Sequence, residues 1–381
     1  MKRFLNKILS PVNLICEFLS FSKVFVYTSL LLLVLTITNV YAGIGDGTIS
    51  GIISGGDHEC EQISNGTIKD GANVLVTNDY TASAIYKNFS ITDSNVEIKQ
   101  SRCGINIYTI GDGNISGSTV RMSSLTSVGY LYYKNDGTKL DYPIYYDTIA
   151  KKVYYWEGGI PNTTKIDVDR EITFSATWAD GICVGSGRTL TIENSYVEIS
   201  TIGVWGISGS PSISGGTLRI YNCGFDTKDL GYQYYTVYKN SGTPSMYGMI
   251  GGKIKDDAYV EVFNNNGVGI ASVKFGTPEG SGIGVPTVIS KNNKGVGIQG
   301  SIIYEGLFTI EGNSGGTYNN TIYGGTFNIT NKNALSRQKI YGGTITINAL
   351  ENEKYETYYK RSDGTGIYGS TIDGGTISMD G

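Results

Sequence analysis

The sequence predicts an all-β fold, a right-handed parallel β-helix (solenoid) with tyrosine-rich loop excursions, preceded by an N-terminal signal peptide. Three features indicate this fold: an apolar leader, a composition with 53 glycines but only 7 prolines, and a short phrase that recurs at close spacing. This glycine-rich, proline-poor composition is neither collagen-like nor that of a proline-rich linker. A hydrophobic content of 40% is too high for a disordered chain. We therefore expect a folded chain that turns often.

The leader determines the expected compartment. Basic residues such as Lys2 and Arg3 precede an apolar run over residues 24–40, and Val40-Tyr41-Ala42 resembles a signal peptidase cleavage site. The alternative is a retained signal anchor, but the run is shorter than the roughly 20 residues that a relaxed membrane span needs. The leader predicts a signal peptide over residues 1–42, cleavage after Ala42, and a secreted or cell-surface protein without a membrane anchor after cleavage.

One short phrase recurs along the chain and predicts its strands. After an apolar residue and two small ones, each copy alternates Thr, apolar, polar, apolar, which is the period of a half-buried strand. Glycines before the strand permit a sharp corner. Gly324 and Gly342 lie 18 residues apart, too close for an intervening helix, so each copy should stack on the previous one as a β-coil. The copies are ISGGTLRI (213–220), IYGGTFNI (322–329), IYGGTITI (340–347), IDGGTISM (372–379) and the diverged ISGSTVRM (115–122).

A longer unit also repeats. ITDSNVEI (91–98) matches IENSYVEI (192–199), and related phrases follow both copies in the same order. We therefore expect one β-helix repeat domain over residues 43–381, with duplicated units at about 84–180 and 181–320 and further coils at 320–381. The alternative architecture is an antiparallel β-sandwich array of modules of about 100 residues. It explains this long repeat equally well, but it does not explain the 18-residue spacing.

Charge and residue counts exclude several functions. A net charge of −4 with 17% charged residues lacks the concentrated basic face that nucleic-acid binding requires. The single histidine, His58, excludes Ser-His-Asp and Cys-His catalysis from most of the chain and cannot assemble a metal site by itself. Four cysteines follow the leader, an even number that permits disulfides but leaves their state open: Cys60, Cys103, Cys183 and Cys223.

The repeated phrase and the glycine turns, such as Asp180-Gly181-Ile182, resemble those of right-handed β-helix proteins of the pectate-lyase-like superfamily. The nearest resemblance is to bacterial surface carbohydrate-binding members that are associated with calcium. It covers roughly residues 84–125, 178–222 and 320–381, and it is specific for architecture but weak for activity. An acidic turn that recurs in step with the strands would be expected in these members. Here the matching turns at Gly267-Val268-Gly269 and Gly295-Val296-Gly297 carry no carboxylate, which puts a regular calcium ladder in doubt.

Aspartates supply the remaining candidates for chemistry. Asp167 and Asp169 share a face if their segment is a strand, whereas the adjacent Asp256 and Asp257 should face opposite ways. A lyase or glycosidase needs converging carboxylates, and soluble surface acids explain these residues more simply. Asp-Gly pairs are turn formers that could also ligate calcium, so no cofactor is expected but calcium stays open: Asp112, Asp136, Asp180, Asp363 and Asp373.

Tyrosine clusters are the candidate ligand-binding residues, because tyrosine combines a flat apolar ring with a polar tip. The alternative is that these rings pack back on the solenoid wall. The candidates are Tyr145, Tyr146, Tyr154, Tyr155 and Trp156.

We therefore expect a non-enzymatic secreted or cell-surface protein that binds carbohydrate or acts as an adhesin on a host or matrix surface. The alternatives are a polysaccharide lyase or glycosidase of the same superfamily, and a structural spacer without a ligand. The chain stops at Gly381, two residues past a strand phrase. Either it is a fragment of a longer chain or a partner covers its last coil, which leaves end-to-end self-association open.

Overall fold

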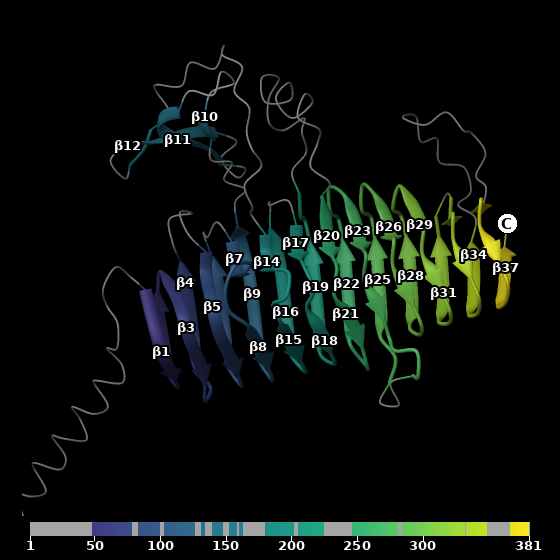
Figure 1. The fold of residues 1–381 in the computed structure, drawn as a ribbon, viewed down its shortest axis with the longest axis horizontal. Helices are drawn as coiled ribbons and strands as arrows, with labels where there is room; N and C mark the ends of the chain where they lie inside the picture. Colours follow the sequence, from purple (N-terminus) through teal and green to yellow (C-terminus); the bar gives the residue numbers. More distant parts are fainter. Residues whose placement is uncertain are drawn as a thin grey trace, which may run out of the picture.

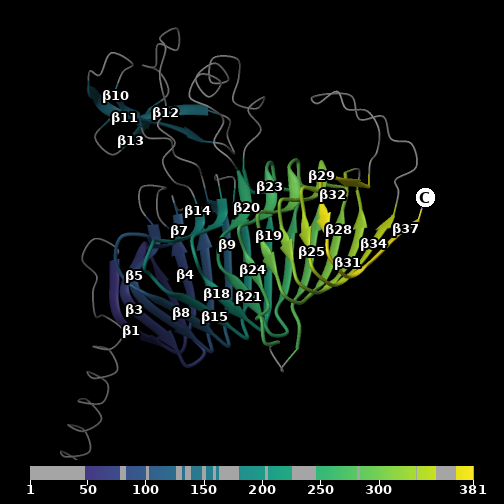
Figure 2. The same cartoon turned by 45° about the vertical axis from the view of Figure 1, so that its right-hand side comes forward.

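The computed structural model contains no helix among the residues that it describes, and its strands form long parallel ladders (Figures 1 and 2). It describes residues 48–77, 83–99, 103–125, 131–133, 139–147, 152–157, 160–162, 180–201, 205–224, 246–280, 284–331, 333–348 and 366–380. The predicted signal peptide lies outside these residues. The all-β prediction is confirmed.

A 12-stranded parallel sheet runs the whole length of the described fold and carries the surfaces discussed below (Figure 1). Along most strands of this sheet, buried residues alternate with partly or fully exposed ones, so one face is core and the other meets solvent. Its strands are β2 (Asp57–Cys60), β4 (Asn73–Thr77), β6 (Asn95–Lys99), β9 (Thr119–Leu125), β16 (Tyr196–Thr201), β19 (Thr217–Tyr221), β22 (Tyr259–Phe263), β25 (Thr287–Lys291), β28 (Leu307–Glu311), β31 (Thr326–Thr330), β34 (Thr344–Asn348) and β37 (Thr376–Asp380).

A 21-stranded sheet contains two further parallel ladders, which meet at β5 because this long strand pairs with both β7 and β8. The first ladder contains β1 (Thr48–Ser54), β3 (Gln62–Lys69), β5 (Ser83–Thr92), β7 (Cys103–Ile107), β14 (Asp180–Val184), β17 (Trp205–Ser208), β20 (Tyr247–Ile250), β23 (Val268–Ala271), β26 (Val296–Gln299), β29 (Gly315–Tyr318), β32 (Leu335–Ser336) and β35 (Ile367–Tyr368).

The second ladder continues from β5 through strands of two to four residues. It contains β8 (Gly113–Ser116), β15 (Leu190–Glu193), β18 (Ser212–Ser214), β21 (Lys253–Lys255), β24 (Lys274–Phe275), β27 (Ile302–Ile303), β30 (Thr321–Ile322), β33 (Lys339–Ile340) and β36 (Thr371–Ile372).

Successive strands visit the three ladders in turn. β26, β27 and β28 lie in the first ladder, the second ladder and the 12-stranded sheet, and β29 then returns to the first ladder. This order is compatible with a β-helix solenoid. Buried isoleucine, valine and phenylalanine side chains from all three ladders form one core. At one corner, buried asparagines bond from coil to coil: Asn265 Nδ2 donates to Asn293 Oδ1, and Asn293 Nδ2 donates to Asn313 Oδ1, both at 2.8 Å.

The repeated phrase folds as predicted, with a corner followed by a half-buried strand. In ISGGTLRI, Gly215 and Gly216 take φ values of 65° and 70° between β18 and β19. Thr326 of β31 lies opposite Thr344 of β34, so copies 18 residues apart stack in register. The described ladders pair in parallel, and the antiparallel sandwich array is therefore wrong for these residues.

The structure corrects the assignment of several glycine turns. Asp180-Gly181 begins strand β14, and the segments at Gly269 and Gly297 lie in strands β23 and β26. These glycines form a row at which the backbones of successive coils approach each other closely. A Cβ on Gly181 would lie 2.5 Å from the Gly206 carbonyl oxygen, and a Cβ on Gly269 would lie 2.7 Å from that of Gly297. Glycine is required here because the coils approach closely, and not because the chain turns.

The tyrosine-rich insert forms a separate four-stranded antiparallel sheet, and no described pairing joins it to the ladders. Its strands are β10 (Leu131–Tyr133), β11 (Lys139–Asp147), β12 (Lys152–Glu157) and β13 (Ile160–Asn162). β11 and β12 pair with Tyr145 opposite Tyr154.

Candidate functional site

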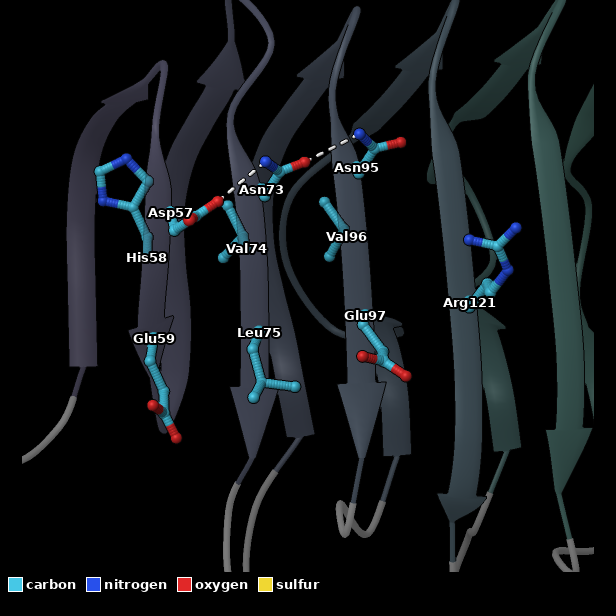
Figure 3. Close-up of a pocket in the computed structure, with 10 residues that line it drawn as sticks. All are labelled: Asp57, His58, Glu59, Asn73, Val74, Leu75, Asn95, Val96, Glu97 and Arg121. Carbon is cyan, nitrogen blue, oxygen red and sulfur yellow. Dashed lines mark hydrogen bonds between the residues drawn. The ribbon is translucent and has the colours of Figure 1, made fainter.

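An open hollow of about 580 Å³ lies on the outer face of the 12-stranded sheet, over β2, β4, β6 and β9 (Figure 3). We call it the N-terminal hollow. Because the four strands pair in register, side chains far apart in sequence become neighbours. The residues that line it are Asp57, His58, Glu59, Asn73, Val74, Leu75, Asn95, Val96, Glu97 and Arg121.

One edge of the hollow is a chain of hydrogen bonds across three strands (Figure 3). Asn73 Nδ2 donates to Asp57 Oδ1, and Asn95 Nδ2 donates to Asn73 Oδ1, each at 2.9 Å. All three side chains are exposed. The chain fixes the orientation of both amides, so this edge presents polar groups in a constant direction to a ligand.

His58 lies at the end of the hollow on the first coil. Its Nε2 lies 2.5 Å from the Gly55 carbonyl oxygen, which can only accept, so Nε2 carries the proton. In the described part of the chain, no three His, Cys, Asp or Glu side chains are grouped to hold a metal ion. The hydrogen bond from His58 to Gly55 joins β2 to the corner that follows β1.

The centre of the hollow alternates acidic and apolar side chains. Leu75 of β4 pairs with Glu59 of β2 on one side and with Glu97 of β6 on the other. Glu97 also forms an ion pair with Lys99 at 2.8 Å. The half-buried Leu75 thus forms an apolar floor between two carboxylates. This combination of apolar surface and a few polar groups is typical of small-molecule sites.

Beyond Glu97, the central outward positions continue as a row of alternating charge, which we call the charged row. Register places Glu97, Arg121, Glu198, Arg219 and Glu261 on successive strands from β6 to β22. Arg121 belongs to both surfaces, because it lines the hollow and also stands in this row. Its guanidinium lies 5.3 Å from the ring centroid of Tyr196 on the next strand. The hollow and the charged row are therefore one continuous surface.

Glu198 is the centre of one cluster in the charged row. It accepts hydrogen bonds from the hydroxyls of Tyr196 and Tyr221, the latter at 2.6 Å. Burial raises the pKa of Glu198, but these hydrogen bonds and the charges of Arg219 and Arg121 outweigh burial, so the pKa lies below its ordinary value. The hydrogen bond to Glu198 is also the main reason that the pKa of Tyr221 is raised.

Glu261 is the centre of a second cluster. It bonds Arg219 Nε at 2.9 Å and Lys291 Nζ at 3.0 Å, and its side chain is only 11% exposed. Burial opposes ionisation, but Lys291 and Arg219 together hold the pKa of Glu261 below its ordinary value. Both cations also lie over the ring of Phe263, which stacks on Tyr221 with centroids 5.0 Å apart. Glu261 is therefore one carboxylate shared by two cations.

The other end of the same sheet carries no charge in its first two outward rows. We call this surface the threonine face. Its side chains project from β28, β31, β34 and β37, and they are Leu307, Thr309, Thr326, Asn328, Thr344, Thr346, Thr376 and Ser378.

The candidate aromatic residues belong to strands β11 and β12 of the separate antiparallel sheet, and their side chains are outside the described residues. They are Tyr145, Tyr146, Tyr154, Tyr155 and Trp156. Register places Trp156 opposite Pro161 and Tyr155 opposite Asn162 and Ile144. Their role in ligand binding stays a prediction.

The aspartate candidates fall into three groups. Asp136, Asp167, Asp169 and Asp363 lie outside the described residues, as does the side chain of Asp180, whereas Asp373 is described and exposed. Asp112 accepts hydrogen bonds from the amide and the hydroxyl of Thr189 at 2.8 and 2.9 Å, and these bonds lower its pKa. Asp112 therefore joins two coils through its carboxylate. Asp256 is buried and Asp257 exposed, as expected for side chains that point opposite ways.

The four cysteines after the leader are buried: Cys60, Cys103, Cys183 and Cys223. Burial is the main reason that the pKa of Cys60 rises to about 12. A thiol that stays neutral is a poor nucleophile and a poor metal ligand. The cysteines therefore act as core residues.

Comparison with known proteins identifies no relative. No family model matches the sequence, and no curated protein or solved structure matches it significantly. Within the described residues, none belongs to a helix with the length and hydropathy needed to cross a membrane.

Proposed function

We propose that this protein is a secreted or cell-surface right-handed β-helix that binds a neutral glycan, without cleaving it, at the N-terminal hollow. The observation that carries the proposal is the hollow itself, about 580 Å³ in volume, with an apolar floor at Leu75 between polar groups on three neighbouring strands. The leader and the repeat architecture support an extracellular role.

The chemistry of the hollow favours a polyhydroxylated ligand. Glu59 and Glu97 can accept hydrogen bonds from sugar hydroxyls, while the amides and Arg121 donate. Leu75 offers an apolar contact for the C–H face of a sugar ring. Three acids, Asp57, Glu59 and Glu97, face one arginine, so a polyanionic glycan would meet net repulsion. This selection disfavours polyuronates, the substrates implied by the pectate-lyase resemblance.

A glycan array probed with the full secreted chain tests this proposal. We expect binding to neutral glycans, loss of that binding in Glu59→Gln/Glu97→Gln, and retention in Glu311→Gln, which changes an exposed carboxylate elsewhere on the same sheet. Equal binding with calcium and with a chelator is expected, because no three His, Cys, Asp or Glu side chains are grouped to hold a metal ion among the described residues. Binding that chelation abolishes would instead assign the ligand to a calcium site.

The tyrosines of β11 and β12 are a further contact for the same glycan or for a host or matrix surface, as an adhesin would need. Tyr145→Ala/Tyr154→Ala, which changes one cross-strand pair, isolates this contribution. Reduced glycan binding in this variant would support it, whereas unchanged binding would leave the hollow as the whole site. End-to-end association between copies is a separate expectation, and sedimentation of the full chain over a range of concentrations measures it.

A second candidate function is glycan hydrolysis, for which Glu59 and Glu97 are the carboxyl pair on either side of Leu75. Their strands are two spacings apart, about 9.6 Å, and inverting glycosidases need carboxyl groups within roughly 9.5 Å of each other, so the two side chains would have to lean toward each other. Release of reducing ends from a bound glycan, abolished in Glu97→Gln, would establish the hydrolase. Binding without release would establish the non-enzymatic module.

A further inference from the structure

The threonine face differs from the charged row of the same sheet in presenting only uncharged side chains in its first two outward rows. Strands β28, β31, β34 and β37 pair residue for residue without a bulge. Adjacent strands are about 4.8 Å apart, and outward neighbours within a strand about 6.8 Å. The eight side chains therefore form a two-dimensional lattice, about 14 Å long across the strands.

Seven of the eight side chains of this lattice are polar and neutral, and the eighth is the exposed Leu307. Threonine is stiff at χ1 because it is branched at Cβ. Ser378 Oγ donates to Thr346 Oγ1 at 3.3 Å, and Asn348 Nδ2 donates to Asn328 Oδ1 at 2.6 Å. A hydroxyl both donates and accepts, so the lattice can match hydroxyl groups of either orientation. Little conformational entropy remains to be lost on binding.

This chemistry points to a flat and ordered partner. A small flexible solute would contact only a few positions of the lattice at once, whereas a surface that itself repeats contacts all of them together, which raises the overall affinity. The lack of charge disfavours a mineral or a polyanion, because neither would find a counter-charge. It also removes the desolvation penalty that charged side chains would impose against a neutral surface.

The alternative of a second copy of the chain is disfavoured by size. The two outward rows of the face are about 14 Å long across the four strands and about 6.8 Å apart along them. This area is far below the roughly 800 Å² per partner of a stable protein interface.

We infer that the threonine face binds the ordered surface of an insoluble neutral polysaccharide, independently of the N-terminal hollow. The proposal adds a second ligand surface to the molecule, at the opposite end of the same sheet. It requires no conformational change, because the lattice is already formed.

Sedimentation of the full chain with microcrystalline cellulose and with crystalline chitin tests the inference. We expect retention on at least one polymer and about a tenfold loss of affinity in Thr344→Lys/Thr346→Lys, because two ammonium groups would have to be desolvated. Thr346→Val keeps the branched shape and removes one hydroxyl, and it should weaken binding less. Thr217→Lys, the same change in the same row outside the face, should bind like the parent chain.

Three outcomes would overturn the inference. The chain would not be retained on either polymer, or the double lysine variant would keep the affinity of the parent chain, or Thr217→Lys would lose as much affinity as the double variant. Capture of the chain by growing ice without retention on the polymers would assign the lattice to ordered water instead. Far-UV circular dichroism and the Tm of each variant distinguish misfolding from lost contacts, and Thr346→Val provides the comparison if the double variant does not fold.

The hollow and the threonine face can fail separately. Glu59→Gln/Glu97→Gln should abolish binding of soluble glycans and leave retention on the insoluble polymer intact. Competition by soluble cellohexaose for retention would place that binding in the hollow and contradict the inference. Loss of glycan-array binding alone would leave the inference standing.

Discussion

The N-terminal hollow and the threonine face lie on one sheet but present different chemistry to solvent. Both alternate buried and exposed residues with the same period, and both bury isoleucine or valine on the inside. Outside, β6 presents Glu97 at the position where β34 presents Thr346. The comparison teaches that packing between coils restricts the interior of each coil, whereas the outward positions are free to acquire a function.

The largest effect should come from breaking the interior that both regions share. A Cβ at Gly269 would lie 2.5 Å from Ser290 Oγ and 2.7 Å from the Gly297 carbonyl oxygen. Gly269→Ala should therefore lower the free energy of unfolding by about 3 kcal/mol in urea denaturation. Gly315→Ala is the matched control, since its Cβ would meet Val296 at an ordinary 3.6 Å. Equal stability of the two variants would contradict the account of the glycine row.

The second prediction separates the charged row from the threonine face. Glu261→Gln leaves Arg219 and Lys291 without their shared carboxylate, and it should lower the free energy of unfolding by about 1 kcal/mol, because Arg219 is partly exposed. Thr346→Val should change stability by less than about 0.5 kcal/mol. A loss in Thr346→Val as large as that in Glu261→Gln would show that the threonine lattice, too, is needed for folding.

Acid should destabilise the charged row and spare the threonine face. The folded-state pKa values of Glu198 and Glu261 lie below the ordinary value of 4.5. Their contribution to stability is present above pH 4.5 and is lost as the pH falls through the folded-state values. We expect Tm to fall in that range, and the fall to be smaller in Glu198→Gln/Glu261→Gln. An identical pH profile in this variant would assign the acid sensitivity to other groups.

The smallest effect concerns reactivity under the N-terminal hollow. With a pKa of about 12, Cys60 stays a neutral thiol at pH 8 while β2 is in place. Iodoacetamide should modify Cys60 slowly in the folded chain and rapidly in urea, as peptide mass spectrometry would show. Above pH 9 the unfolded thiol ionises first, so this group disfavours folding from there to about pH 12. Rapid modification at pH 8 would mean that the first coil opens.

Sequence reasoning predicted those features that depend on local pattern. The alternation after Gly-Gly and the 18-residue spacing predicted that Thr326 and Thr344 would stack, and they do. Sequence reasoning was wrong at glycines that can serve either a turn or a close contact between coils. Gly269 has the local signature of a turn, but contact with the next coil determines its role.

The hollow was missed for a different reason. Glu59 and Glu97 are 38 positions apart in the sequence, and only the register of three strands places them on either side of Leu75. Coils of unequal length hide that register from a reading of the sequence alone. The detectable signal was the alternation within NVLVT and NVEIK, which identifies Leu75 and Glu97 as outward residues without naming their neighbours.

Isothermal calorimetry of the full chain with a neutral glycan selected on the array tests whether the N-terminal hollow is the glycan site. We expect saturable binding by the parent chain, at least a tenfold weaker affinity in Glu59→Gln/Glu97→Gln, and parent-like affinity in Thr344→Lys/Thr346→Lys. Equal affinity in the hollow variant and the parent chain would contradict the assignment of the glycan site to the N-terminal hollow.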